Sequence, residues 1–157
     1  MALEPEEIHK NWEKFLSLLG KIGGRSEVAV NMAEALGERL ALCPASSRKN
    51  FHNSFPGGLV DHSIRVLGNA LRLKAAFEWD VPKESLIVAC LFHDLGKVGD
   101  ENEDYYVQQK DTYKIQKYGD EYMTSETIKF MTVPDRSVYL CQTFGLKLTH
   151  DEFLAIK

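Results

Sequence analysis

Residues 86–97 read LIVACLFHDLGK, and this stretch decides how the chain folds. Its apolar beginning predicts a helix that is buried around most of its circumference. The imidazole of His93 and the carboxylate of Asp94 follow directly. An ionised carboxylate in such a place is costly to desolvate unless a positive group compensates it. Because a helix C-terminus disfavours an anion by about 0.3–1 kcal/mol, the compensating partner is either the ammonium of Lys97 or a metal ion.

A second imidazole favours the metal ion. The sequence predicts a helix over residues 59–79, on which His62 lies between Leu59 and Val66 on an apolar line and should face the core. Two imidazoles and a carboxylate from adjacent helices suit one Mn²⁺, Fe²⁺, Co²⁺, Ni²⁺ or Zn²⁺ ion, and suit Mg²⁺ less well because of the nitrogens. The alternative is that His93 and Asp94 form a hydrogen-bonded pair in the core without a ligand.

The rest of the sequence predicts an all-α domain packed around these two helices. Ser26 is expected to cap one helix, and the capping-box pattern Thr149-x-x-Glu152 to open the last one. Alternating residues over 105–118 predict a small β-hairpin or an ordered loop. Helical periodicity predicts the other helices at residues 6–19, 26–42, 83–94, 125–131, 134–144 and from 149 to the chain end.

Composition narrows the class of protein further. The chain has 157 residues and no internal linker or repeat, so we expect a single domain over residues 1–157. A formal net charge of −4 argues against binding nucleic acid mainly through non-specific charge. The absence of an apolar run long enough for a bilayer, and of a signal sequence, predicts a cytoplasmic protein with no membrane partner. Cysteines are widely spaced and give neither a disulfide framework nor a zinc site: Cys43, Cys90 and Cys141.

Tyrosines are interleaved with lysines between residues 105 and 122. Such a segment could stack a base and hold a phosphate. Half-buried cross-strand tyrosine pairs are the structural alternative.

Two segments together resemble the HD-domain superfamily of metal-dependent phosphohydrolases. They are residues 51–63, FHNSFPGGLVDHS, and residues 93–97, HDLGK. The PGGL-x-x-H pattern is similar to the subgroup found in small stand-alone hydrolases and attached to bacterial 3′–5′ exoribonucleases. The resemblance covers residues 48–99, and implies a helical phosphohydrolase acting on nucleotides, cyclic nucleotides, alarmones or nucleic-acid ends.

The resemblance also implies roles for individual residues. His62, His93 and Asp94 would hold one divalent metal ion. Asp94 and Lys97 would act in catalysis, with Lys97 in the place of a basic residue that contacts phosphate. The residues that precede the first ligand could hold substrate oxygens: Arg48, Lys49 and His52.

One ligand that the resemblance implies is missing. The superfamily closes its site with a further Asp on a later helix, amid apolar residues. Asp135 follows Pro134 at a helix start and Asp151 lies in a cap, so neither interrupts a buried stripe. We therefore expect either a shortened chain, whose continuation past Lys157 carries the ligand, or a degenerate module that binds a nucleotide or a protein partner without catalysis. A nuclease acting at 3′ ends is a third option.

Overall fold

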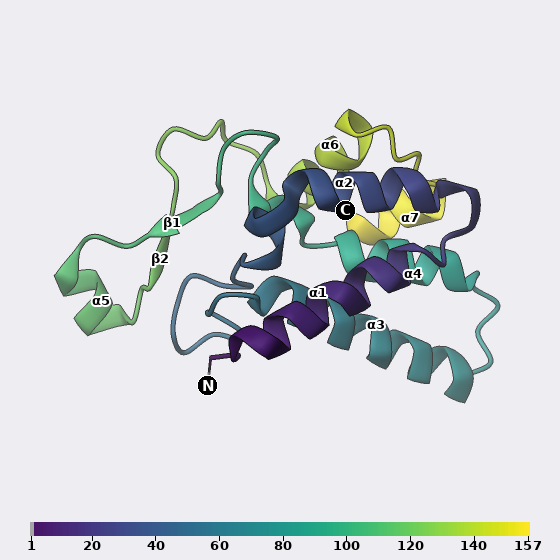
Figure 1. The fold of residues 1–157 in the computed structure, drawn as a ribbon, viewed down its shortest axis with the longest axis horizontal. Coiled ribbons are helices and arrows are strands. Elements are labelled where there is room, and N and C mark those ends of the chain that lie inside the picture. The colour runs from purple at the N-terminus through teal and green to yellow at the C-terminus, as the bar shows by residue number, and fades with distance from the viewer. Residues whose placement is uncertain (1) are drawn as a thin grey trace.

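The computed structural model describes residues 2–157, which form a helical body with one small sheet, confirming the predicted all-α class with a small hairpin (Figure 1). Within residues 2–157, no helix combines the length and the apolar character that crossing a membrane requires. The α-helices are α1 (Pro5–Leu19), α2 (Ser26–Ala41), α3 (Gly58–Ala76), α4 (Lys83–Phe92), α5 (Thr112–Tyr118), α6 (Val133–Thr143) and α7 (His150–Ile156). The 3-10 helices are η1 (Gly23–Arg25) and η2 (Leu95–Val98), and the strands are β1 (Tyr106–Gln108) and β2 (Tyr122–Thr124).

Helix α4 lies at the centre of the body, where it packs against α1, α3 and α7. Five of its ten residues are buried, and all five lie in the apolar run of residues 86–92. The ring of Phe92 meets the ring of Phe15 on α1 edge-on, with 6.3 Å between centroids. Because α4 packs against three other helices, the positions of His93 and Asp94, which follow it, are fixed by these packing contacts.

Two glycines shape the start of α3. Gly57 has a φ of 80°, in the left-handed region that favours glycine. A Cβ on Gly58 would collide with the carbonyl oxygen of Asn53. The PGG sequence therefore lets the preceding loop return tightly against the first turn of α3, one turn before His62.

Residues 106–124, here called the arm, project from the body (Figure 1). Strand β1 pairs with β2 in antiparallel fashion, with Val107 opposite Met123. Between the strands, the side chain of Asp111 caps α5 by accepting hydrogen bonds from two backbone N–H groups. The hairpin predicted over 105–118 is thus confirmed, but it extends beyond that range, because residues 112–118 are helical and the pairing strand follows them.

Other predicted boundaries also need correction. Helix α3 ends at Ala76, because Glu78 adopts a φ of 52° that a right-handed helix cannot continue. No helix forms over 125–131 within the described chain, where the hydroxyls of Ser125 and Thr127 bond to Glu103 instead. Ser26 is the first residue of α2 and makes no capping hydrogen bond. The capping box that opens α7 is confirmed.

Candidate metal centre

Three side chains converge where α3 passes the end of α4. The Nε2 atom of His62 lies 3.3 Å from Nε2 of His93 and 3.7 Å from Oδ2 of Asp94. The Nε2 atom of His93 lies 3.3 Å from the same carboxylate oxygen. With bonds of about 2.1 Å, a tetrahedral ion separates its ligands by about 3.4 Å and an octahedral one by about 3.0 Å. The triangle of donor atoms therefore has the size that a single ion requires.

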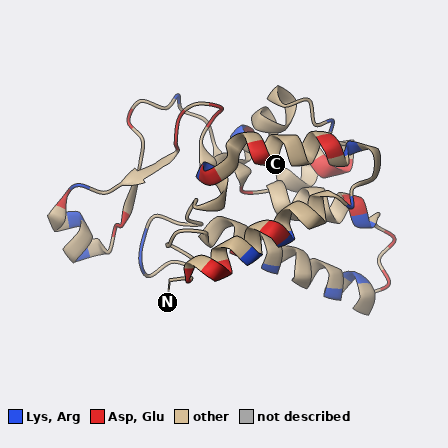
Figure 2. Cartoon of the chain, viewed as in Figure 1, with Lys and Arg blue, Asp and Glu red and all other residues tan. Residues whose placement is uncertain are grey.

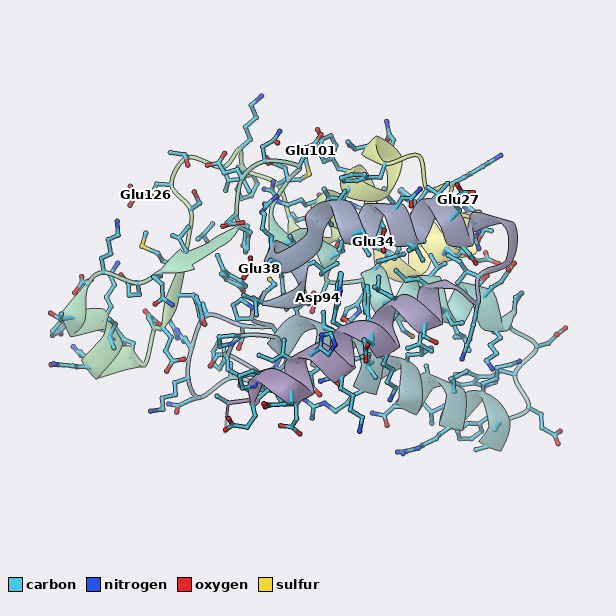
Figure 3. The ribbon with its side chains drawn as sticks, in the orientation of Figure 1. Glu27, Glu34, Glu38, Asp94, Glu101 and Glu126 are labelled. Carbon is cyan, nitrogen blue, oxygen red and sulfur yellow. The ribbon has the colours of Figure 1, made fainter. Side chains whose placement is uncertain are left out.

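The secondary structure explains this convergence. His62 lies in the second turn of α3, His93 directly follows α4, and Asp94 precedes η2. The three side chains are 22, 28 and 18% exposed, respectively, so the site is partly enclosed and still open to a small molecule. Figure 3 shows Asp94 near the middle of the molecule, whereas Glu101 and Glu126 lie on outer loops.

The hydrogen bond at the other ring nitrogen of His93 orients this imidazole. Its Nδ1 atom lies 2.9 Å from the carbonyl oxygen of Cys90, one turn earlier. A carbonyl only accepts, so Nδ1 carries the proton and donates it. Neutral His93 then has its lone pair on Nε2, the atom that faces His62 and Asp94. Metal-binding histidines are commonly oriented by such a contact.

The charges of the three groups also suit a cation. Burial, together with the imidazoles of His93 and His52, lowers the pKa of His62 to about 4, so this side chain is neutral at pH 7. Burial opposes the charged form of His93, but the hydrogen bond and charge of Asp94 outweigh it and raise the pKa of His93. Burial also favours neutral Asp94, yet contacts with His93 and Lys97 hold the pKa of that carboxyl well below its usual range. Asp94 is therefore an anion.

Lys97 completes the immediate surroundings of Asp94. Its ammonium donates to Oδ2 of Asp94 and to the carbonyl oxygen of Ala45, both at 2.7 Å. It thus compensates the carboxylate and ties the loop before α3 to the site. Between Asp94 and Lys97, a Cβ on Gly96 would collide with the carbonyl oxygen of Val133. The HDLGK sequence therefore needs glycine where η2 packs against α6.

The residues predicted to hold substrate divide into two places. The ring of His52 is exposed, and its centroid lies 4.8 Å from that of His62. Arg48 instead donates from Nε to Asp120 of the arm at 2.8 Å. The backbone N–H of Lys49 donates to the carbonyl of Gly119, also in the arm. The structure brings His52 to the three ligands, and places Arg48 and Lys49 against the arm.

Neither later aspartate joins the cluster. Asp135 contacts Thr132 and Lys157, and Asp151 is exposed beside His150. In the part of the chain that the structure describes, the group of potential metal ligands consists of His62, His93 and Asp94. Among the described residues, no fourth histidine, cysteine, aspartate or glutamate joins this group.

Sequence reasoning missed a positioning network around Asn53. This residue has a φ of 53°, and its amide donates to Asp61 at 2.8 Å and to the carbonyl of Gly58 at 3.0 Å. Arg65 donates to the amide oxygen at 2.7 Å. These contacts fix the loop that carries His52 against the helix that carries His62. The signal was an Asn, which tolerates the left-handed region, shortly before the PGG turn.

Comparison with known proteins assigns this region to a family. Residues 59–134 match the HD domain family, and the match contains the whole candidate metal centre. The chain therefore carries an HD domain, and the superfamily resemblance is confirmed. Members of this family are generally metal-dependent phosphohydrolases that bind a divalent metal. Searches of curated proteins and of solved structures gave no significant match.

Proposed function

We propose that this chain is a metal-dependent phosphohydrolase that acts on a nucleotide or a related phosphate ester. His62, His93 and Asp94 would hold one divalent ion. The observation that carries the proposal is the triangle of donor atoms, with sides of 3.3, 3.3 and 3.7 Å, inside an HD domain. The two nitrogens favour Mn²⁺, Fe²⁺, Co²⁺, Ni²⁺ or Zn²⁺ over Mg²⁺.

An ion in this place would polarise a phosphoryl oxygen and lower the pKa of a water molecule. The protein residues supply orientation and charge. Asp94 and the Nε2 lone pair of His93 are preset by the contacts with Lys97 and Cys90. The ammonium of Lys97 places a positive charge where phosphate oxygens would approach, and can stabilise charge that develops during the reaction. His52, exposed beside His62, can contact a substrate oxygen.

Phosphate release tests this proposal. Purified protein with added Mn²⁺, Co²⁺ or Ni²⁺ should release phosphate from some member of a nucleotide panel. The variants His62→Asn and Asp94→Asn should lose this release together with calorimetric Mn²⁺ binding. His150→Asn is a matched control, because His150 is an exposed histidine beside an aspartate and should leave both unchanged. Inactivity with every metal across nucleotides and oligonucleotides would contradict the proposal.

A second candidate is a binding module that recognises a nucleotide or a protein partner without hydrolysing anything. The observation that favours it is that Asp135 and Asp151 both lie in other contacts. Calorimetry in EDTA separates the two candidates, because nucleotide binding with no metal and no turnover would favour the module. The third option, a 3′-end nuclease, predicts that a labelled oligonucleotide is shortened from its 3′ end. Hydrolysis confined to mononucleotides would exclude it.

A further inference from the structure

A cavity lies between the arm and the loop of residues 45–53, here called the bridging loop. Its volume is about 440 Å³, within the range of about 300–1,000 Å³ typical of small-molecule sites. The bridging loop contributes Ser47 and Arg48 to its lining. The arm contributes two tyrosines and a lysine, Lys114, Tyr118 and Tyr122. The lining thus combines aromatic rings and cationic side chains with one carboxylate, that of Asp120.

We propose that this cavity binds a nucleotide unit of a single-stranded oligonucleotide, and that a unit a few positions along the same strand reaches the candidate metal centre. The proposal rests on the proposed function for the identity of the reacting group, a phosphate ester. The binding itself requires no metal and no turnover, because the residues of the cavity lie outside the three metal ligands.

The tip of the arm has the chemistry of a base-stacking surface. The rings of Tyr113 and Tyr118 are 56 and 46% exposed and lie 6.1 Å apart. The ammonium of Lys117 lies 5.0 and 5.2 Å from their centroids. Figure 2 shows the positive positions of α5 at this tip. Exposed aromatic rings stack bases of any sequence, while neighbouring cations follow the phosphates.

The bridging loop connects the cavity to the candidate metal centre. Both ends of the loop lie at the metal centre, because Lys97 donates to the carbonyl of Ala45 at the start and His52 lies beside His62 at the finish. In between, the carbonyl of Ser47 accepts hydrogen bonds from the backbone of Glu121 and Tyr122, at 2.9 and 3.1 Å. Arg48 lines the cavity, and from there to His52 the chain advances by four residues, which span at most about 14 Å. At a rise of about 3.4 Å per nucleotide, a few units of one strand cover that distance.

The charge of the whole chain fits a strand better than a duplex. A formal net charge of −4 gives little non-specific attraction to a densely charged double helix. In addition, Nε of Arg48 already donates a hydrogen bond to Asp120, so this guanidinium is partly neutralised. Recognition at the arm therefore depends on stacking, which requires unpaired bases, with a small electrostatic contribution from Lys114 and Lys117.

Fluorescence anisotropy in EDTA tests the proposal, with a fluorescein-labelled octanucleotide of adenosines as the probe. Because stacking on an aromatic ring contributes substantially per base, Tyr118→Ala should weaken binding about ten-fold or more. Tyr118→Phe keeps the ring and should bind like the wild type. Tyr139→Ala removes a comparably exposed tyrosine from α6, 39% exposed, and should leave binding unchanged.

The salt dependence gives a second, independent readout. Lys114→Gln should reduce the slope of log affinity against log salt concentration by about 0.7, the value for one phosphate contact on a single strand. Lys10→Gln on the exposed side of α1 is the control, and should leave the slope unchanged.

Several results would overturn the inference. They are an absence of octanucleotide binding by the wild type, equal binding by Tyr118→Ala, and a loss in Tyr139→Ala as large as in Tyr118→Ala. If circular dichroism shows that Tyr118→Ala loses helix, the test rests on the affinity of Tyr118→Phe and on the salt slope of Lys114→Gln. Failure of this test leaves Mn²⁺ binding and phosphate release intact, whereas failure of the proposed function leaves binding in EDTA intact.

Discussion

The helical body and the arm are built in opposite ways. In the body, buried hydrophobic side chains run through all the helices that surround the candidate metal centre. In the described chain, no hydrophobic residue between Val98 and Ile128 is buried, so the arm contributes none to the core. Hydrogen bonds and one ion pair attach the arm to the bridging loop. The metal ligands therefore stand on the most densely buried part of the fold, whereas the cavity depends on a part with little burial.

This difference suits two different tasks. Metal ligands need fixed positions, and packing around α4 supplies them. A surface that accepts varied bases needs less rigidity, and weakly packed segments often carry binding functions. The following predictions test this division, in order of decreasing effect.

Removing a core ring should produce the largest loss of stability. Phe92→Ala deletes a fully buried side chain between α4 and α1, and should lower the free energy of unfolding by about 3–5 kcal/mol. Ile115→Ala in the arm, at a side chain 39% exposed, should change it by less than about 0.5 kcal/mol. Urea denaturation followed by circular dichroism measures both. Equal losses would contradict the division into body and arm.

The ion pair between η1 and α7 should contribute the next largest effect. Arg25 donates to both carboxylate oxygens of the buried Glu152, at 2.6 and 2.8 Å. Glu152→Gln should therefore cost about 1.5–3 kcal/mol at pH 7. Glu126→Gln, on an exposed loop, is the control and should cost nothing measurable.

The stabilisation that this ion pair contributes should depend on pH. Although burial favours neutral Glu152, hydrogen bonds from Arg25 and Thr149 lower its pKa below the ordinary value of 4.5. The folded state therefore binds a proton less readily than the unfolded state, and the carboxylate stabilises the fold above pH 4.5. The difference in stability between wild type and Glu152→Gln should shrink as the pH falls below that value. A difference that grows in acid would contradict this assignment.

Proton competition should weaken metal binding in acid. The pKa of His93 is raised and that of His62 is lowered to about 4, so His93 takes up a proton first as the pH falls. Below the pKa of His93, Mn²⁺ affinity should fall about ten-fold per pH unit, equivalent to about 1.4 kcal/mol. Calorimetry between pH 8 and pH 5 measures this dependence. His150→Asn should follow the same curve, and a flat profile would argue against His93 as a ligand.

Loosening the arm should have the smallest effect on overall stability. Arg48→Ala removes a partly exposed ion pair with Asp120, which contributes about 0.2–1 kcal/mol. Hydrogen exchange should accelerate in β2, while the urea midpoint of the body hardly moves. Exchange that accelerates in α4 to the same extent would show that the arm and the body unfold together.

The comparison also explains what the sequence could predict. Helices α1 and α2 bury regular apolar stripes, and α4 is a continuous apolar run, so the sequence predicted all three. The apolar line on α3 likewise predicted that His62 faces the core. In α5 the helix depends on the cap at Asp111 while its side chains remain exposed, and the alternation of tyrosines predicted a strand instead. The contacts of Lys97 with Ala45 and of Arg48 with Asp120 join residues far apart in the chain. Such pairs leave no local pattern in a single sequence.

Anomalous diffraction tests the central claim most directly. Crystals grown with Mn²⁺ or Co²⁺ should show a single anomalous peak at bonding distance, about 2.0–2.3 Å, from Nε2 of His62, Nε2 of His93 and a carboxylate oxygen of Asp94. The peak should disappear in His62→Asn crystals of the same form. Strong metal peaks elsewhere, with none between these three side chains, would contradict the account.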